Sequence, residues 1–285
     1  MSASANSAAG TPAPSDELLV VENLSKSFGD HQVLGGIDVT VRSGEFMCIV
    51  GPSGAGKTTL LQCLSGLIAP TAGIVSLRGR QITEPPAEMA IVFQDYSRSL
   101  MPWMSVLDNV MLPLRSTTKD KKQRKETAMA ALVEVGLKEH VQKYPWQLSG
   151  GMQQRVAIAR ALAYAPAIVL MDEPFASVDA QTRADLEDLT LRVKKHLGIT
   201  ILLVTHDIDE AVYLSDRVLV LGKKPTQVVD LIETHLGADR DQIATKATRE
   251  FAELRSRVYR EIRHGDIPAA TADAEPARSP DHVLN

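Results

Sequence analysis

Four short apolar segments along the chain are each followed closely by a polar residue or a glycine. Such runs, bounded by polar positions, predict strands that are buried on both faces. Polar groups at the carboxyl ends of parallel strands are where open α/β sheets bind ligands. The pattern therefore predicts an α/β fold whose ligand site lies after the strands Phe46–Val50, Ala90–Phe93, Ala167–Met171 and Thr200–Val204.

Apolar residues at helical spacing fill much of the chain between these strands. Leu60, Leu61, Leu64 and Leu67 predict a helix directly after the first strand. From about residue 95 to 163 the pattern is helical, which predicts a helical subdomain inserted into the α/β core. Its signals are a capping box at Ser105–Asp108, an apolar stripe at Ala128, Leu132 and Val135, and a helix stop at Gly136.

The C-terminal third predicts two closing strands and a docking helix. Val218–Leu221 and Gln227–Ile232 flank a turn, and an apolar face within 241–264 is formed by Phe251, Leu254, Val258 and Ile262. We expect residues 18–240 to form the main domain. Residues 1–17 and 265–285 are rich in Ala, Pro, Ser and Asp, so we expect disordered tails and no signal peptide.

The composition is that of an ordinary globular protein of 285 residues, with 44% apolar and 23% charged residues. A net charge of −4 provides no field that would gather nucleic acid, and we expect no nucleic-acid partner. The densest basic run, Lys119–Lys125, precedes a helical pattern and is interpreted as a solvated helix start. No apolar stretch approaches the roughly 20 residues that cross a bilayer. Cys48 and Cys63 are expected as buried small hydrophobic residues in a cytoplasmic protein.

The segment Gly51–Thr58 fits the phosphate-loop pattern G-x-x-x-x-G-K-[ST] between a predicted strand and a predicted helix. Glycines let backbone N–H groups surround the phosphates, Lys57 neutralises their charge and Thr58 offers a hydroxyl to Mg²⁺. The free N–H groups and aligned dipoles of the helix start attract an anion further. The alternative, a glycine-rich turn with a surface lysine, leaves this order of elements unexplained.

The other strand ends carry residues suited to phosphoryl transfer to water. Asp172 is placed to hold Mg²⁺ opposite Thr58, and Glu173 to polarise the attacking water. His206 suits a hydrogen bond to the γ-phosphate or the water, and the amide of Gln94 suits Mg²⁺ or the water. The alternatives are an acidic turn at Asp172-Glu173 and a structural histidine.

A second candidate phosphate segment is Leu148–Met152, far along the chain from the glycine loop. Ser149 is expected to cap a helix and leave its first amides free for an anion. Gly150 and Gly151 destabilise a helix, so we expect them to allow close approach of the backbone to another group. A plain helix cap is the alternative.

Together these motifs resemble the ATP-binding-cassette (ABC) ATPases over about Leu18–Leu236. The corresponding motifs are Walker A at Gly51–Thr58, the Q-loop at Gln94, the signature at Leu148–Gln153, Walker B at Ile168–Asp172 with Glu173 after it, the D-loop at Ser177–Asp179 and the switch at His206. The resemblance implies a RecA-like P-loop NTPase core with an inserted helical subdomain and an antiparallel β region. It also implies ATP and Mg²⁺ as cofactors and a peripheral position at the cytoplasmic face of the cell membrane.

The resemblance assigns roles to individual residues. It implies that Glu173, His206, Lys57 and Gln94 are catalytic and that Thr58, Gln94 and Asp172 hold the metal. Phe28 stands where tyrosine is more usual for stacking on adenine, and Met152 replaces the usual glutamine of the signature. The implied nucleotide contacts are Phe28, Gly51, Pro52, Ser53, Gly54, Ala55, Gly56, Lys57, Thr58, Thr59, Ser149, Gly150, Gly151, Gln153 and Asp179.

In such ATPases the signature of one subunit closes over ATP on another, which implies a head-to-tail homodimer here. Permease subunits and, indirectly, a solute-binding protein are the other implied partners. Met101–Val110 and Tyr144–Arg155 resemble ATPase subunits of nitrate, sulfonate and taurine importers, unless Trp103 and Trp146 only pack the subdomain. The roughly 80 residues after His206 are too few for the extra β-barrel of sugar importers.

Other functions remain open at this point. An importer of another small solute, such as a pyrimidine vitamin precursor, carries the same motifs. So do an exporter and a soluble ABC ATPase of DNA repair or translation. A small-molecule kinase needs only the phosphate loop, and it leaves Ser149-Gly150-Gly151 unexplained.

Overall fold

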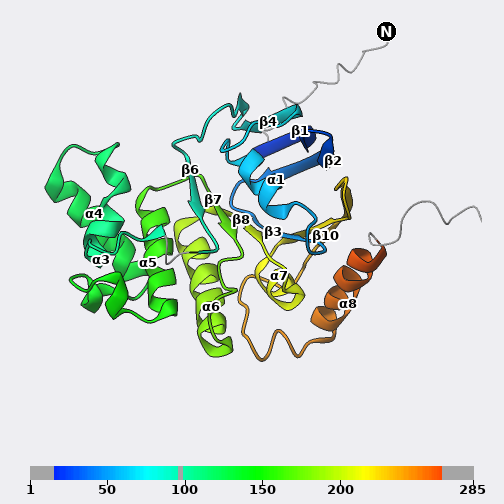
Figure 1. Ribbon diagram of the computed structural model, residues 1–285. Helices are drawn as coiled ribbons and strands as arrows, with labels where there is room; N and C mark the ends of the chain where they lie inside the picture. The colour runs from blue at the N-terminus through cyan, green and yellow to red at the C-terminus, as the bar shows by residue number, and fades with distance from the viewer. Residues whose placement is uncertain (1–15, 96–98, 265–285) are drawn as a thin grey trace, which may run out of the picture.

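A six-stranded sheet forms the centre of the computed structural model, which describes residues 16–95 and 99–264 (Figure 1). Its strand order is β10-β9-β3-β8-β7-β6, and only β10 runs antiparallel to its neighbour. The strands predicted from the four apolar runs and from the closing pair are all confirmed. Their bounds are β3 Phe46–Val50, β6 Met89–Val92, β7 Ile168–Asp172, β8 Thr200–Val204, β9 Arg217–Leu221 and β10 Val228–Glu233.

The sheet separates two hydrophobic cores because successive side chains of a strand point to opposite faces. Phe46, Cys48 and Val50 of β3 lie in the core shared with the helical region, whereas Met47 and Ile49 lie in the other core. All five are buried. Cys48 and Cys63 are free and buried, as expected, and burial raises the pKa of the Cys48 thiol well above its usual value.

A second, antiparallel sheet of order β2-β1-β4-β5 covers one face of the central sheet through helix α1, Lys57–Leu64 (Figure 1). This is the antiparallel β region that the resemblance implied. Its strands are β1 Glu17–Phe28, β2 His31–Arg42, β4 Ala72–Leu77 and β5 Arg80–Gln81. Helix α1 is shorter than its apolar pattern predicts. Gly66 is left-handed at φ 73° and ends the helix, so Leu67 is exposed.

A group of helices at the left of Figure 1 confirms the helical pattern between the strands β6 and β7. Ser105 caps α3 by accepting a 3.1 Å bond from the Asp108 N–H, and the stripe Ala128, Leu132 and Val135 is fully buried. The basic run is an exposed helix start, capped by Asp120. The helices are α3 Val106–Met111, η1 Pro113–Arg115, α4 Lys121–Glu134, η2 Lys138–His140, η3 Pro145–Gln147 and α5 Gly150–Ala163.

The remaining helices cover the other face and the far edge of the central sheet: α6 Ala180–Leu197, α7 Ile208–Leu214 and α8 Arg249–His264. The C-terminal helix begins at Arg249, not near residue 241 as expected. Residues 237–248 instead form turns bonded to α6 and α7, with Gln242 donating to the Glu187 carboxylate and Arg240 to the Tyr213 carbonyl. Phe251 and Val258 of α8 are buried as predicted, whereas Leu254 and Ile262 are half-buried.

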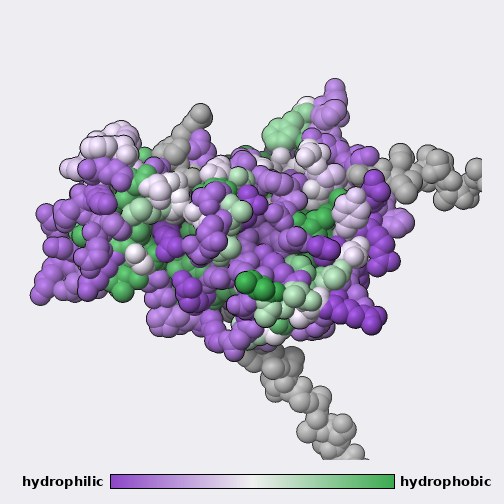
Figure 2. All heavy atoms as spheres, turned by 90° about the horizontal axis from the view of Figure 1, so that it is seen from below, coloured by the Kyte–Doolittle hydropathy of each residue, from purple (hydrophilic) through white to green (hydrophobic). Residues whose placement is uncertain are grey.

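Seen from below Figure 1, the surface is mainly hydrophilic, with apolar atoms in small groups (Figure 2). Within residues 16–95 and 99–264, no helix combines the length and apolarity needed to cross a bilayer. Of the expected tails at 1–17 and 265–285, residues 1–15 and 265–285 lie outside the described residues. Glu17 begins strand β1, so the N-terminal tail is shorter than expected.

Candidate active site

The loop from Gly51 to Gly56 joins β3 to α1 in a conformation that needs glycine. Gly54 and Gly56 have φ angles of 79° and 77°, in the left-handed region. A β-carbon on Gly56 would also lie 2.6 Å from the Val33 Cγ1 methyl group. The Thr226 hydroxyl donates a 2.6 Å hydrogen bond to the Ala55 carbonyl, which ties the loop to the segment after β9.

Lys57 lies at the start of α1 and turns its side chain back over this loop. Its Nζ donates to the Gly51 carbonyl at 2.8 Å and the Pro52 carbonyl at 3.1 Å. Burial lowers the pKa of Lys57, while the charges of Glu173 and Asp172 act in the opposite direction. The ammonium is therefore held against the carbonyl groups at the start of the loop.

Asp172 ends strand β7 directly beside the start of α1. The Thr58 hydroxyl donates to Asp172 Oδ1 at 3.5 Å, so two of the three side chains expected to hold the metal face each other. Burial raises the pKa of Asp172, and the Thr58 hydrogen bond lowers it in part.

Two predicted catalytic side chains contact the same carboxylate oxygen of a third, Glu173. The Gln94 amide donates to Glu173 Oε2 at 3.0 Å, and His206 Nδ1 lies 3.2 Å from the same oxygen. Glu173 holds a left-handed φ of 43°, which is rare for a residue with a β-carbon, and its N–H donates to the Val204 carbonyl at 2.9 Å. Three neighbouring strand ends thus aim Gln94, Glu173 and His206 at one point.

Glu173 and His206 border a cavity of about 480 Å³, which is also lined by residues 53–59 and Lys224. The cavity brings together three of the predicted segments. Sequence reasoning missed Lys224; the signal was the basic pair Lys223-Lys224 at the turn after a buried strand. A second lysine adds positive charge to a cavity already suited to phosphates.

The residue after the switch histidine is fixed by contacts that sequence reasoning did not anticipate. Asp207 caps α7 by accepting from the Glu210 N–H, and its own N–H donates to the Thr205 hydroxyl at 3.0 Å. Arg183 of helix α6 donates to Asp207 Oδ2 at 3.3 Å.

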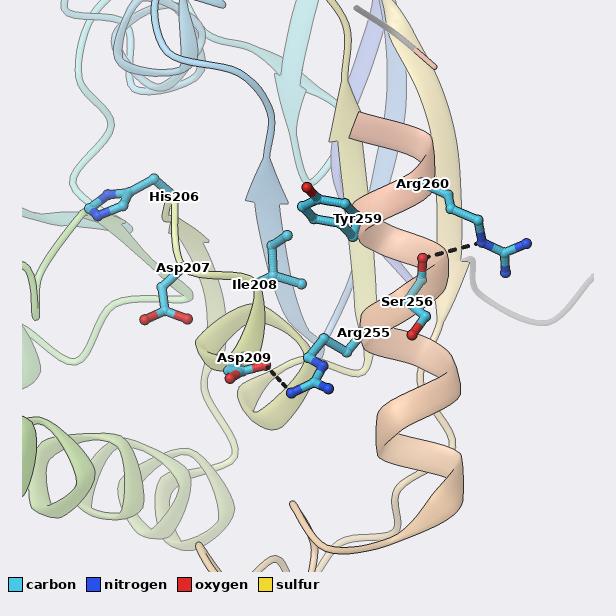
Figure 3. A pocket seen from close by; sticks show the side chains of 8 residues that line it. All are labelled: His206, Asp207, Ile208, Asp209, Arg255, Ser256, Tyr259 and Arg260. Carbon is cyan, nitrogen blue, oxygen red and sulfur yellow. Dashed lines mark hydrogen bonds and ion pairs between the residues drawn. The ribbon is translucent and has the colours of Figure 1, made fainter. Parts of the chain in front are cut away.

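His206 also lines a larger cavity of about 660 Å³ between α7 and α8 (Figure 3). Figure 3 shows Asp209 turned towards Arg255 of α8, and their nearest charged atoms are 3.8 Å apart. The C-terminal helix therefore borders the switch segment.

Within one chain, the signature segment Leu148–Gln153 does not line the cavity around Lys57. Ser149 caps α5 by accepting from the Met152 N–H at 3.4 Å, as predicted. Gly151 does approach another group closely, and that group is the Thr182 side chain of the same chain. The Gln153 amide donates to the carbonyls of Pro145 and Leu148, so it holds the segment before the signature.

Two further predicted nucleotide contacts also lie outside the cavity lining. Asp179 caps α6 by accepting from the Thr182 N–H and hydroxyl, and these bonds lower its pKa. The Phe28 ring is 53% exposed, and the Lys26 ammonium lies 5.0 Å from its centroid. Phe28 is therefore open to stacking, whereas the Asp179 carboxylate already has partners.

Comparisons with known proteins agree with this geometry. A family model described as ABC transporter matches residues 34–176. An uncharacterized ABC transporter ATP-binding protein of Methanocaldococcus jannaschii is 46% identical over 244 residues, which are 84% of this chain and 89% of that protein.

Two other relatives carry the names of transported ions. The bicarbonate transport ATP-binding protein CmpD of Synechocystis is 38% identical and covers 90% of this chain and 96% of its own length. The nitrate import ATP-binding protein NrtC of Synechococcus elongatus is 40% identical over 80% of this chain, which spans only 35% of that longer protein.

Solved structures show the same fold. CbiO1 of Clostridium perfringens, part of an ABC transporter complex, has a TM-score of 0.73 at 28% identity and covers 88% of this chain and all of its own. A dimeric ATP-binding cassette bound to ADP and phosphate has a TM-score of 0.66 at 31% identity. The match covers 76% of this chain and 99% of that structure's chain.

Proposed function

This chain belongs to the ABC transporter family and acts as its ATP-hydrolysing subunit, and we propose that it energises import of a small anion through a separate permease. The cargo class is that of nitrate, sulfonates, taurine or bicarbonate. The observation that carries the catalytic part is the meeting of Gln94 and His206 on one oxygen of Glu173, beside the Lys57 loop.

The geometry supports a division of labour in hydrolysis. Backbone amides of residues 53–59 and the Lys57 ammonium bind the phosphates. The Glu173 carboxylate accepts a proton from the attacking water, because its position beyond β7 faces the phosphate loop. His206 and Gln94 hold that carboxylate and sense the terminal phosphate. Charge compensation and positioning, not covalent chemistry, are what this reaction needs.

The residues around Thr58 fit a magnesium ion. Mg²⁺ prefers oxygen ligands and is usually bound by one or two protein oxygens together with substrate phosphates and water. The Thr58 hydroxyl and the Asp172 carboxylate are two such oxygens, 3.5 Å apart. Within the described part of the chain, no three His, Cys, Asp or Glu side chains form a metal cluster. When bound, the ion would neutralise charge that develops on the phosphates.

The separation of the signature from the cavity supports a dimer. Ser149 and the start of α5 do not line the cavity around Lys57. A second copy placed head to tail brings its Ser149 helix start to the open side of that cavity. A similar cassette, 31% identical, is dimeric.

A rigid exposed tryptophan supports a docking site for the permease. Trp103 is 71% exposed, so it does not pack the subdomain interior. Buried Asn109 fixes the loop below it, because its amide donates to the carbonyls of Met101, Met104 and Ser105. We assign this loop and the neighbouring surface after Gln94 to the short cytoplasmic helices of a permease, which places the chain peripherally at the cytoplasmic membrane face. A solute-binding protein would act through that permease.

The choice of cargo rests on relatives named for bicarbonate and nitrate transport. No observation favours a vitamin-precursor importer, an exporter, a repair or translation ATPase, or a kinase more strongly.

The first test measures ATP hydrolysis against protein concentration. A dimeric enzyme loses activity per molecule on dilution below its dissociation constant, and the product is free phosphate. Activity per molecule that stays constant where sedimentation shows only monomers contradicts the shared site, and a phosphorylated acceptor identifies a kinase.

The second test reconstitutes the chain in vesicles with a permease encoded beside it and supplies nitrate, bicarbonate or taurine. ATP-dependent uptake of one of these supports the cargo class. ATP-dependent uptake only of a solute that carries no anionic group contradicts it.

A further inference from the structure

Trp146 is an exposed aromatic side chain directly before the signature segment. It belongs to η3, Pro145–Gln147, and the residue is 72% exposed. One face of the indole stacks on Tyr144, with ring centroids 6.2 Å apart and planes at 17°. The Trp146 side chain is therefore not part of the hydrophobic core of its own chain.

The segment that carries Trp146 is fixed relative to Ser149. The Gln147 side chain accepts from the Tyr144 N–H at 2.8 Å, and Pro145 is buried. The Gln153 amide donates to the Pro145 carbonyl at 3.0 Å and the Leu148 carbonyl at 3.3 Å. Because Gln153 lies on the same helix that Ser149 caps, the ring and the helix start form one rigid unit.

In the proposed head-to-tail dimer, that helix start meets the terminal phosphate held by the Lys57 loop of the other copy. Trp146 lies three residues before Ser149, a separation of at most about 10 Å. A nucleoside triphosphate extends over a similar length from its last phosphate to its base. In this dimer the indole is therefore within reach of the nucleoside held by the other copy.

The exposed Phe28 ring gives the nucleoside a first aromatic neighbour. Stacking is attractive for any base because every base has a π face, and two aromatic surfaces can enclose one base. Tyr144 covers one face of Trp146. Its remaining surface is open to a ligand.

We propose that Trp146 of one copy packs on the base and ribose of the nucleotide held by the other copy. The proposal rests on the head-to-tail dimer of the proposed function. It makes Trp146 a nucleotide-binding residue that acts only across the interface.

The chain has two tryptophans, so each can be observed alone. In Trp103→Phe/Glu173→Gln, emission comes from Trp146 only, and in Trp146→Phe/Glu173→Gln from Trp103 only. ATP with Mg²⁺ is added while sedimentation follows the dimer. We expect Trp146 emission to change in step with dimer formation and to remain constant at dilutions where the protein stays monomeric.

The outcomes separate the two proposals. A dimer that forms without any change in Trp146 emission overturns this inference and leaves the dimer intact. Equal changes from both tryptophans also overturn it, because they indicate a general conformational change. Failure to form any ATP-dependent dimer contradicts the proposed function and, with it, the role of Trp146.

Kinetics provide a second readout that a merely structural role would not give. Trp146→Ala should raise the KM for ATP and for GTP by roughly tenfold, with Trp146→Phe close to the parent protein. Inhibition by inorganic tripolyphosphate, which has no base, should be the same in all three. Equal loss of tripolyphosphate binding in Trp146→Ala assigns the residue to the fold of the signature segment and overturns the inference.

Discussion

Gly151, at the start of α5, lies so close to Thr182 of α6 that a β-carbon at position 151 would collide with the Thr182 Cγ2 methyl group. The signature helix and the helix capped by Asp179 are therefore in direct contact within one chain. Any movement of one helix start is transmitted to the other, since packed side chains do not compress.

Replacing this glycine tests the contact. Gly151→Ala should lower the free energy of unfolding by about 1–3 kcal/mol through overpacking, and should reduce ATP hydrolysis. Thr182→Ser keeps the hydroxyl that bonds Asp179 and removes only the methyl group. The double variant Gly151→Ala/Thr182→Ser should therefore regain stability in chemical denaturation. A double variant as unstable as Gly151→Ala would show that the methyl contact is not the cause.

Much of the fold was predictable because buried parallel strands leave a strong apolar signal. The runs ending at Val50, Met171 and Val204 became adjacent strands, and the phosphate loop followed the first of them. Local signals also predicted the caps at Ser105 and Ser149. The start of α8 was not predictable, because the bonds that hold residues 237–248 come from α6 and α7, far away in sequence.

The candidate site was predictable in its parts but not in its contacts. Motif spacing identified Gln94, Glu173 and His206, yet not their common use of one carboxylate oxygen. Lys224 has no motif, and the role of Gln153 in holding Pro145 depends on a turn that the sequence does not reveal. Such contacts arise from the tertiary fold.

The role of Glu173 is tested by removing its charge alone. Glu173→Gln should lower kcat for ATP hydrolysis by about 10²–10⁴-fold, because a carboxamide cannot accept the proton. ATP binding and dimer formation should persist, since Lys57 and the loop amides are unchanged. Glu126→Gln, an exposed position on α4, is the matched control. Rapid phosphate release by Glu173→Gln in a single-turnover assay would remove Glu173 from this role.

Buried Glu210 gives stability a defined pH dependence. Burial raises its pKa well above the usual value, and the nearby carboxylates of Glu187 and Asp207 raise it further. Between the pKa of Glu210 in the unfolded chain and its raised pKa in the folded protein, the folded protein keeps a proton that the unfolded chain loses. The free energy of unfolding therefore falls as the pH rises between these two pKa values.

The variant Glu210→Gln has no proton to lose at this position. Relative to the parent protein, its stability should increase progressively as the pH is raised from about 5, just above the ordinary pKa of a glutamate, towards neutrality. Urea denaturation across this range measures the difference, with Glu126→Gln as control. The Glu187 carboxylate, whose pKa burial also raises, leaves part of the pH dependence in place. A difference that shrinks with rising pH would show that Glu210 is ionised in the folded state.

Arg183 is expected to hold the switch segment for catalysis without touching the nucleotide. It pairs with Asp207, the neighbour of His206, and both side chains are 33% exposed. Removing the guanidinium leaves Asp207 with only its capping bonds, so the His206 ring samples more positions. Arg183→Ala should lower kcat roughly fivefold with little change in KM, in keeping with the loss of one partly exposed ion pair.

Arg183→Lys separates charge from geometry, since lysine keeps the charge and loses the planar fork of donors. It should recover part of the kcat that Arg183→Ala loses. Asp207→Asn should resemble Arg183→Ala in kcat, because asparagine still caps α7 but carries no charge. The double variant Arg183→Ala/Asp207→Asn should then lose no more kcat than either single variant. Fully additive losses would mean that the two side chains act on ATP hydrolysis by separate routes.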